Sequence, residues 1–154
     1  MRHVHRMRVP FGDVDHAGIV YYPRLFHYFH LAYEGFFHDG LGKPFQEMFD
    51  QRGVVAPVVA CNARFRAPLR HGETLAIEVW ISRLGRRSWT LRFELRGAGE
   101  SGAARAEGEV THAFAAWRTL EPVEIPLELR DAVAPWVEAE PEPPAGLARG
   151  DRPL

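Results

Sequence analysis

The chain of 154 residues lacks several features that define other protein classes. Its single cysteine, Cys61, excludes an intrachain disulfide and fits a reducing compartment. No apolar run reaches the ~18 residues of a membrane-spanning helix, and the first residues carry no apolar signal-peptide core. Charge of one sign is not in excess, because 19 Lys and Arg face 20 Asp and Glu. We therefore expect a cytoplasmic protein that binds neither membranes nor nucleic acid.

The residues that are present suffice for one hydrophobic core. Hydrophobic residues make up 46% of the chain and aromatic residues 12%, and its length is close to the ~150 residues of a single domain. After residue 137 the composition turns to Pro, Glu, Gly and Arg. We predict one domain over residues 1–137 and a mobile tail over residues 138–154.

Alternating apolar residues predict that most of the chain forms β-strands. The predicted strands cover residues 4–11, 54–65, 75–82, 89–96 and 104–117. A short turn over residues 84–87 links two of them as a hairpin. In the last strand Val110, His112 and Phe114 share one face. Long alternating strands joined by short turns favour an antiparallel sheet with one buried face.

A helix is predicted over residues 23–39, because Pro23 suits a first helical position and Gly40 a helix end. Its apolar residues are too many for a single narrow stripe, so we expect other structure to cover most of it. A shorter amphipathic helix is predicted over residues 126–137. The fold class is α+β, a curved antiparallel sheet wrapped around one long central helix.

The loop before the predicted helix carries the residues best suited to chemistry. Asp13, Asp15 and His16 lie between Gly12 and Gly18. Carboxylates beside a helix N-terminus can assist attack on a carbonyl that backbone N–H groups polarise. Aspartate in a glycine-bounded loop is equally typical of a turn or a helix cap, so the residues alone leave both interpretations open.

Candidate donors for such a carbonyl are few. Pro23 has no N–H, so the donors must be the amides of Tyr22, Arg24 or Leu25.

The same loop resembles the signature of the 4-hydroxybenzoyl-CoA thioesterase family, which has the hotdog fold. The matching stretch is Gly12-Asp13-x-Asp15-x-Ala17-Gly18-Ile19-Val20-x-Tyr22-Pro23. The resemblance continues through residues 52–53, 59–63 and 86–89 and covers roughly residues 5–117. It implies an acyl-CoA thioesterase that releases a free acid and coenzyme A, with no cofactor besides the coenzyme A of the substrate.

The resemblance also implies roles for individual residues. Asp15 matches the catalytic carboxylate, acting as a nucleophile or as a general base. The Tyr22 backbone amide matches the donor that polarises the thioester carbonyl, and Asp13 matches an aspartate that holds the loop. His16, beside the catalytic position, is a candidate substrate contact or electrostatic neighbour of Asp15.

Further candidate contacts lie outside the loop. Arg86 and Arg87 match basic residues that contact coenzyme A phosphates, although two exposed arginines in a turn also serve solubility. His30 falls where 4-hydroxybenzoyl-specific members carry an acidic residue, and it can pair with Glu34 one helical turn on. This departure puts 4-hydroxybenzoyl specificity in doubt, while the aromatic helix still permits an aryl or medium-sized acyl group.

Two other functions remain alternatives to the thioesterase. A non-catalytic acyl-CoA or acyl-carrier binding module, and a hotdog dehydratase acting on 3-hydroxyacyl thioesters, fit the same fold. No metal site is expected, because His27, His30 and Glu34 lack any wider ligand motif. Cys61 is predicted to be a buried inert thiol. An unpaired sheet edge predicts a homo-oligomer, a dimer or a homotetramer built as a dimer of dimers, with sites between subunits.

Overall fold

The structure is a computed structural model that describes residues 1–44 and 53–138. One long helix lies in the first third of the chain, and strands dominate the remainder of the described part. The elements are β1 (His3–Arg8), α1 (Arg24–Gly35), β2 (Val54–Val55), β3 (Val58–Phe65), β4 (Thr74–Leu84), β5 (Ser88–Gly97), β6 (Ala106–Ala113), β7 (Ala115–Ala116) and α3 (Leu127–Val133). Short 3-10 turns cover Phe11–Asp13 and Ala134–Trp136, and a π-helical turn covers Phe36–Gly40.

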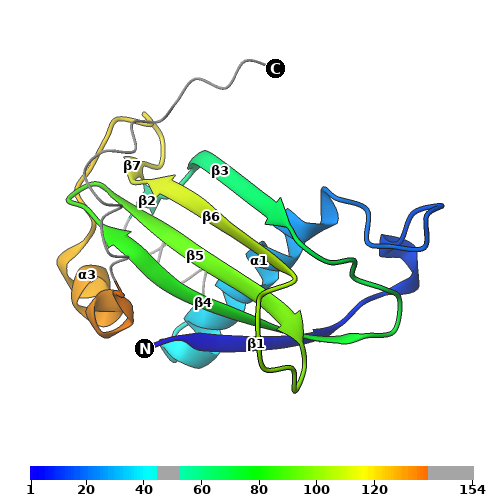
Figure 1. The fold of residues 1–154 in the computed structure, drawn as a ribbon. Helices are drawn as coiled ribbons and strands as arrows, with labels where there is room; N and C mark the ends of the chain where they lie inside the picture. The colour runs from blue at the N-terminus through cyan, green and yellow to red at the C-terminus, as the bar shows by residue number, and fades with distance from the viewer. Residues whose placement is uncertain (45–52, 139–154) are drawn as a thin grey trace, which may run out of the picture.

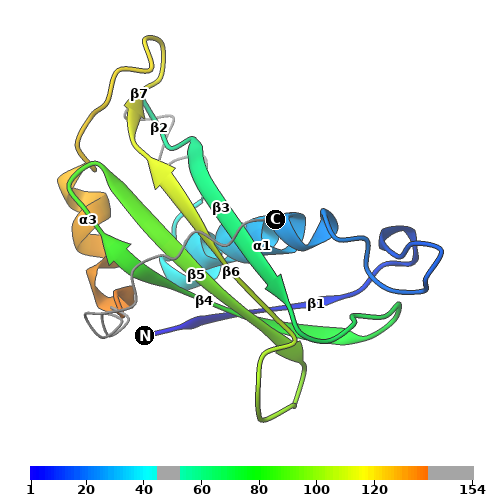
Figure 2. The same cartoon turned by 45° about the horizontal axis from the view of Figure 1, so that its top comes forward.

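The main sheet is antiparallel, as the alternation predicts. Its five strands run in the order β1-β4-β5-β6-β3, and β2 pairs with β7 in a separate ribbon. Figures 1 and 2 show this sheet curving past α1, which lies against its inner face. The α+β fold and the hairpin between β4 and β5 are thereby confirmed.

Two predicted strands are each divided in the structure. The run over residues 54–65 forms β2 and β3, and the run over residues 104–117 forms β6 and β7. Pro57 lies at the first break, where it has no N–H to donate and only accepts a hydrogen bond from Ala113, at 3.0 Å. The breaks let β2 and β7 pair away from the main sheet.

Helix α1 begins one residue after Pro23 and passes at Phe36 into the π-helical turn. Its buried side chains are Leu25, Tyr28, Phe29, Ala32 and Tyr33. The expectation that other structure covers most of the helix is confirmed, because eight of its twelve residues are buried or half-buried, while His27, His30 and Glu34 lie on an exposed side. The sheet covers one side of α1 and leaves this other side open.

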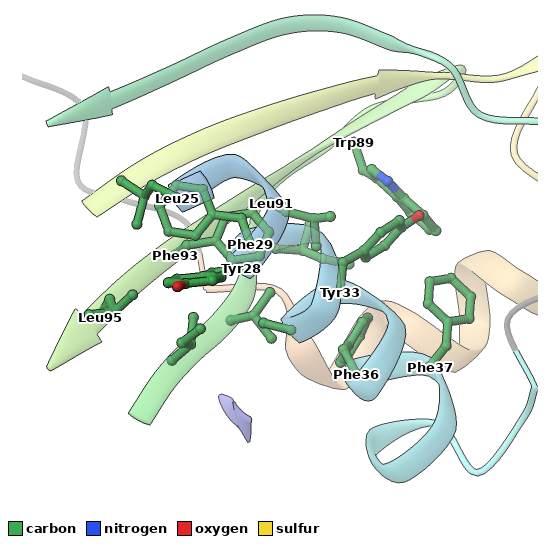
Figure 3. Packing of buried hydrophobic residues seen from close by; sticks show 14 of the residues in the cluster. Leu25, Tyr28, Phe29, Tyr33, Phe36, Phe37, Trp89, Leu91, Phe93 and Leu95 are labelled. Atoms are coloured by element: carbon green, nitrogen blue, oxygen red, sulfur yellow. The ribbon is translucent and has the colours of Figure 1, made fainter. Parts of the chain in front are cut away.

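Aromatic stacking joins α1 to the sheet, as Figure 3 shows. The ring of Phe29 stacks on that of Phe93 in β5, with centroids 4.6 Å apart and planes 15° from parallel. Apolar residues of the inner face surround this contact: Leu75, Ile77, Val79 and Ile81 from β4, and Trp89, Leu91 and Leu95 from β5. The outer face carries ion pairs instead, among them Arg96 with Glu94 at 2.6 Å.

The end of the described chain packs against the sheet. The helix predicted over residues 126–137 is divided into α3 and the 3-10 turn that follows it. Of the predicted tail, only Glu138 is described; its N–H donates to Ile81 and its carboxylate pairs with Arg2 at 2.6 Å. The rest of the tail, residues 139–154, lies outside the described residues, and the domain boundary stays a prediction.

Gly108 of β6 allows α1 to approach the sheet closely. A Cβ at this position would lie 2.5 Å from the Asn62 carbonyl oxygen and 2.6 Å from Cε2 of Phe29. Both distances are far below van der Waals contact, and one neighbour is backbone. Glycine is therefore required where β3, β6 and the helix meet.

Gly108→Ala should destabilise the fold by about 1–3 kcal/mol, the usual cost of overpacking a core. Chemical denaturation measures this difference. Gly12→Ala is the control, because nothing lies within 4 Å of its Cβ position and its free energy of unfolding should stay within about 0.5 kcal/mol of the parent. Equal stability of Gly108→Ala and the parent chain would contradict this packing.

Candidate active site

A tight turn presents Asp15 at the end of the loop. Val14 and Val20 form an antiparallel bridge, the Asp15 N–H donates to Ile19 at 2.9 Å, and the Gly18 N–H donates to Asp15 at 2.9 Å. Gly18 has φ +72°, the left-handed conformation that closes such a three-residue turn and that glycine adopts without strain. Gly18 thus fixes the turn conformation that positions Asp15.

Asp13 ties the loop to the helix. Its carboxylate accepts a hydrogen bond from the Tyr28 hydroxyl at 2.9 Å and pairs with Arg24 Nε at 3.2 Å. Burial, together with this hydrogen bond to Asp13, raises the pKa of Tyr28, so the phenol stays protonated and keeps donating. Both helix partners lie in the first turns of α1, which locks the loop against the helix start.

The side chain of Asp15 differs from that of Asp13 in being exposed. Its Oδ1 accepts a hydrogen bond from the Ala17 N–H at 2.8 Å, which limits rotation of the carboxylate. The turn interpretation of this residue therefore holds, and it is compatible with the chemical one, because the bond occupies Oδ1 only. An exposed, oriented carboxylate is available to a reacting group.

The start of α1 leaves one amide as the donor. The Arg24 N–H donates to Tyr21 at 2.9 Å, and the Leu25 N–H donates to Tyr22 at 3.2 Å. Pro23 has none, and among the described residues the Tyr22 N–H has no backbone acceptor. Of the three amides that the sequence offers, the Tyr22 N–H is thus the one that no backbone carbonyl of the described residues occupies.

Asp15 and Tyr22 line one cavity of about 410 Å³, here named the loop cavity. Phe65 and Arg66 at the end of β3, with Leu69 beyond it, form the facing wall. The structure thus brings the two predicted catalytic residues to one solvent-accessible site.

A second, smaller cavity of about 180 Å³ lies between α1 and the sheet and is named here the helix cavity. Its walls come from α1 (Phe26, Phe29, His30, Tyr33), β3 (Val58, Cys61), β5 (Phe93) and β6 (Val110, His112). His30 Nε2 pairs with Glu34 Oε1 at 3.1 Å, which confirms the predicted pair. The prediction that Cys61 is buried is wrong, because β3 is an edge strand and leaves the thiol exposed.

His112 is a residue of this cavity that sequence reasoning did not select. Only its place on the same face of the strand as Val110 and Phe114 indicated that it points inward. Its exposed fraction is 5%, and its ring stacks on Tyr33 with centroids 4.8 Å apart. Burial, together with a smaller contribution from the nearby His30, lowers the pKa of His112 to about 4, so the imidazole is neutral at pH 7.

The remaining predicted contacts lie away from the loop cavity. His16 is exposed on the turn and lines neither cavity. Arg86 and Arg87 occupy the β4–β5 turn, where Arg86 Nε pairs with Glu124 at 3.0 Å. Figure 1 shows this turn beside α3, at the opposite end of the sheet from the loop. Along β5, Ser88 at the turn lies seven positions from Leu95, which aligns through Ala106 with Phe65 of the loop cavity; this is about 23 Å at ~3.3 Å per residue.

Neither a metal site nor a membrane helix is seen in the described ranges. No group of three or more His, Cys, Asp or Glu side chains within residues 1–44 and 53–138 is placed to hold a metal ion. In the same ranges no helix is long and apolar enough to cross a membrane.

Comparison with known proteins identifies the family. Residues 9–137 match the Thioesterase-like superfamily. The chain belongs to this family. It is similar to the 1,4-dihydroxy-2-naphthoyl-CoA hydrolase of Thermosynechococcus vestitus, with 29% identity over 134 residues, which cover 87% of each chain. It is also similar to the 4-hydroxybenzoyl-CoA thioesterase of a Pseudomonas species, with 32% identity over 91 residues, 58% of this chain and 64% of that protein.

Solved structures agree with the sequence relatives. A gentisyl-coenzyme A thioesterase has a TM-score of 0.74 and 30% identity, over 86% of this chain and 100% of that one. The predicted resemblance, the hotdog fold and the predicted class of enzyme, a thioester hydrolase of acyl-CoA, are confirmed.

The lowered pKa of His112 predicts acid-sensitive stability. Below pH 6.5 the unfolded chain binds a proton at this residue that the folded chain resists until about pH 4. Neutral His112 therefore makes its full contribution to the free energy of unfolding above pH 6.5. This contribution, about 3 kcal/mol at most, is lost as the pH falls toward 4.

His112→Phe should therefore show a smaller loss of unfolding free energy between pH 7 and pH 4 than the parent chain, measured by denaturation at each pH. His27→Phe, at an exposed position of α1, is the matched control and should keep the parent's pH dependence. Parallel pH profiles for the parent and His112→Phe would show that burial does not perturb this imidazole.

Proposed function

We propose that this thioesterase hydrolyses an acyl-CoA with an aromatic acyl group, using Asp15 and the Tyr22 amide. The observation that carries the proposal is that both groups line the loop cavity, at the point where α1 begins. The aromatic side chains of the neighbouring helix cavity suit an aryl group. Dihydroxynaphthoyl, hydroxybenzoyl and gentisyl groups, named for the relatives' substrates, are all aromatic.

In this proposal the Tyr22 N–H binds the thioester carbonyl oxygen. As the carbonyl carbon is attacked, negative charge develops on that oxygen, and a donor already fixed by the helix start stabilises it without reorganisation. The positive end of the α1 dipole acts in the same direction. Pro23 assists indirectly, because it fixes φ where the chain enters the helix.

Asp15 supplies the second part of the chemistry. As a general base it removes a proton from a water molecule that attacks the carbonyl carbon. As a nucleophile it attacks the carbon itself, giving an anhydride that water then cleaves. In both routes the carbon–sulfur bond breaks, the thiolate of coenzyme A leaves and takes up a proton, and the acid is released. The exposed carboxylate suits either route.

A second copy of the chain would complete the site. Strand β3 pairs only with β6 among the described strands, and its free edge exposes Val58 (54%), Val59 (61%) and Phe65 (52%). Such an apolar edge is a template for pairing with another strand. Antiparallel pairing of two β3 edges about a twofold axis brings opposite ends of the two sheets together.

This pairing accounts for the position of the arginines. Within one chain Arg86 and Arg87 lie at the end of the sheet remote from Asp15, so they cannot serve the same loop cavity. The twofold arrangement brings the β4–β5 turn of the second copy toward that cavity. We infer that Arg86 and Arg87 bind the phosphates of coenzyme A held at the neighbour's Asp15.

Asp15→Asn should lower kcat by at least about 10²-fold, because an amide neither attacks the carbonyl nor accepts the proton of water. Initial rates on a panel of aroyl-CoA substrates measure this. Asp39→Asn, an exposed aspartate beyond the other end of α1, is the control and should keep the parent rate. Near-parental turnover by Asp15→Asn would remove Asp15 from the mechanism. Tight binding without turnover by the parent chain would instead indicate a binding module.

Mixing a variant with weakened substrate binding and a variant with lost turnover tests the shared site. Arg86→Ala combined with Arg87→Ala should raise KM for aroyl-CoA by about 10-fold or more, as expected for lost charged hydrogen bonds, and should leave aroyl-pantetheine, which lacks the nucleotide, unaffected. Co-refolding this variant with Asp15→Asn should restore parental KM in part of the sites, since mixed dimers contain one intact combination. Activity of the mixture equal to the sum of the two variants alone would contradict a shared site.

A further inference from the structure

The loop cavity has a positively charged residue that the mechanism above does not use. Among its described lining residues, Asp15 carries the only negative charge and Arg66 the only positive one. The proposed mechanism gives the attack to Asp15 and the carbonyl oxygen to the Tyr22 amide. Arg66, one residue beyond the end of β3 and on the wall that faces Tyr22, is left without a role.

A β-bulge places Arg66 at the rim of this cavity. The N–H groups of Arg66 and Ala67 both donate to the Arg105 carbonyl, at 2.8 and 3.0 Å. Two consecutive donors on one acceptor are the pattern of a bulge, which bends a strand and redirects its side chains. Phe65 lines the cavity, so strict alternation would turn the next side chain away from it. The bulge explains why Arg66 lines the cavity as well.

The guanidinium of Arg66 has donors to spare. Its Nη2 donates to Glu107 Oε1 at 2.6 Å, its single hydrogen bond within the described residues. Glu107 also lies 3.4 Å from Arg92 and 3.7 Å from Arg64, so three arginines share this carboxylate. A guanidinium has five N–H donors, and the Arg66 side chain is 46% exposed. It can therefore turn toward the cavity and bind a further anion.

Cleavage of a thioester creates such an anion at this site. After attack on the carbonyl carbon, the oxyanion at the Tyr22 N–H re-forms the C=O bond, the carbon–sulfur bond breaks, and its electron pair stays on sulfur as a thiolate. In the nucleophilic route the adduct can instead expel Asp15, because a carboxylate is a weaker base than an alkanethiolate. A group that stabilises the thiolate therefore favours the productive direction.

We propose that Arg66 is a catalytic residue that stabilises the departing thiolate of coenzyme A. The inference rests on the proposed thioesterase function and adds a charge partner for its leaving group. A guanidinium N–H donates to the sulfur as the carbon–sulfur bond lengthens, and Arg66 gives up no proton. The thiolate then takes its proton from Asp15 in the general-base route and from water in the nucleophilic route.

The experiment varies the leaving group at a constant aroyl group. Aroyl-pantetheine releases an alkanethiolate, and the thiophenyl ester of the same acid releases a much less basic thiolate that needs less stabilisation. We expect Arg66→Gln to lower kcat/KM about 10- to 100-fold for aroyl-pantetheine, the usual effect of one lost charged hydrogen bond, and less than about 3-fold for the thiophenyl ester. Both esters lack phosphate, so a residue that only binds phosphate would change neither rate.

Arg64→Gln is the matched control. Arg64 also lies beside Glu107 but does not line the loop cavity, so both rates should stay at the parent values. Arg66→Lys keeps the positive charge and should recover part of the rate with aroyl-pantetheine. An equal fall with both esters, or no fall with either, would overturn the proposal. Inactivity of the parent chain toward every aroyl thioester, coenzyme A esters included, overturns the proposed function itself.

A second measurement uses binding alone and does not depend on turnover. Free pantetheine, the thiol product of the pantetheine ester, should inhibit the parent chain more strongly as the pH rises and the thiol ionises, because the thiolate pairs with Arg66. This gain should disappear in Arg66→Gln and persist in Arg64→Gln. The same pH dependence of inhibition in Arg66→Gln and the parent would overturn the proposal.

Discussion

The packing of α1 against the inner face of the sheet is the constraint on which the site depends. Phe29 stacks on Phe93, and Gly108 leaves room for this approach. Because the sheet sets the axis of the helix, it also sets where the helix begins and where the Tyr22 amide lies. The geometry of the proposed site at the start of α1 therefore follows from core packing in the middle of the helix.

The position of Asp15 depends on the helix through the loop, which is bonded to the first turns of α1. Asp13 bonds to Tyr28 and Arg24, so the first aspartate of the motif holds the loop to the helix, while the second is exposed and is the one proposed to act on the substrate. Gly18 closes the turn in a conformation that other residues adopt only under strain. The two aspartates look equivalent in the sequence, but in the structure one is bonded to the helix and the other is exposed.

The sequence predicts much of this arrangement because its patterns are local. Alternation identifies the strands, Pro23 identifies the helix start, and the glycine-bounded loop indicates a candidate site, in which the family resemblance selects Asp15. Strand breaks at Pro57 escape prediction, because they depend on which strands pair. The cavity around His112 also escapes, because its walls come from α1, β3, β5 and β6, and no local pattern encodes which side chains meet.

Exposure at β3 shows a further limit of local pattern. An apolar strand such as β3 is expected to be buried, yet Cys61 and Val59 are exposed, because the strand forms the edge of the sheet. Likewise, Arg86 and Arg87 are remote from Asp15 within one chain, although the resemblance gives them to one site. Both observations concern surfaces that a second copy would cover, and a single sequence describes only one copy.

The most direct test of the central claim is a crystal structure of Asp15→Asn with an aroyl-CoA bound. The account predicts the thioester carbonyl oxygen within about 2.7–3.1 Å of the Tyr22 nitrogen, with the carbonyl carbon facing the side chain at position 15. A thioester bound elsewhere, or a carbonyl oxygen directed away from the start of α1, would contradict it.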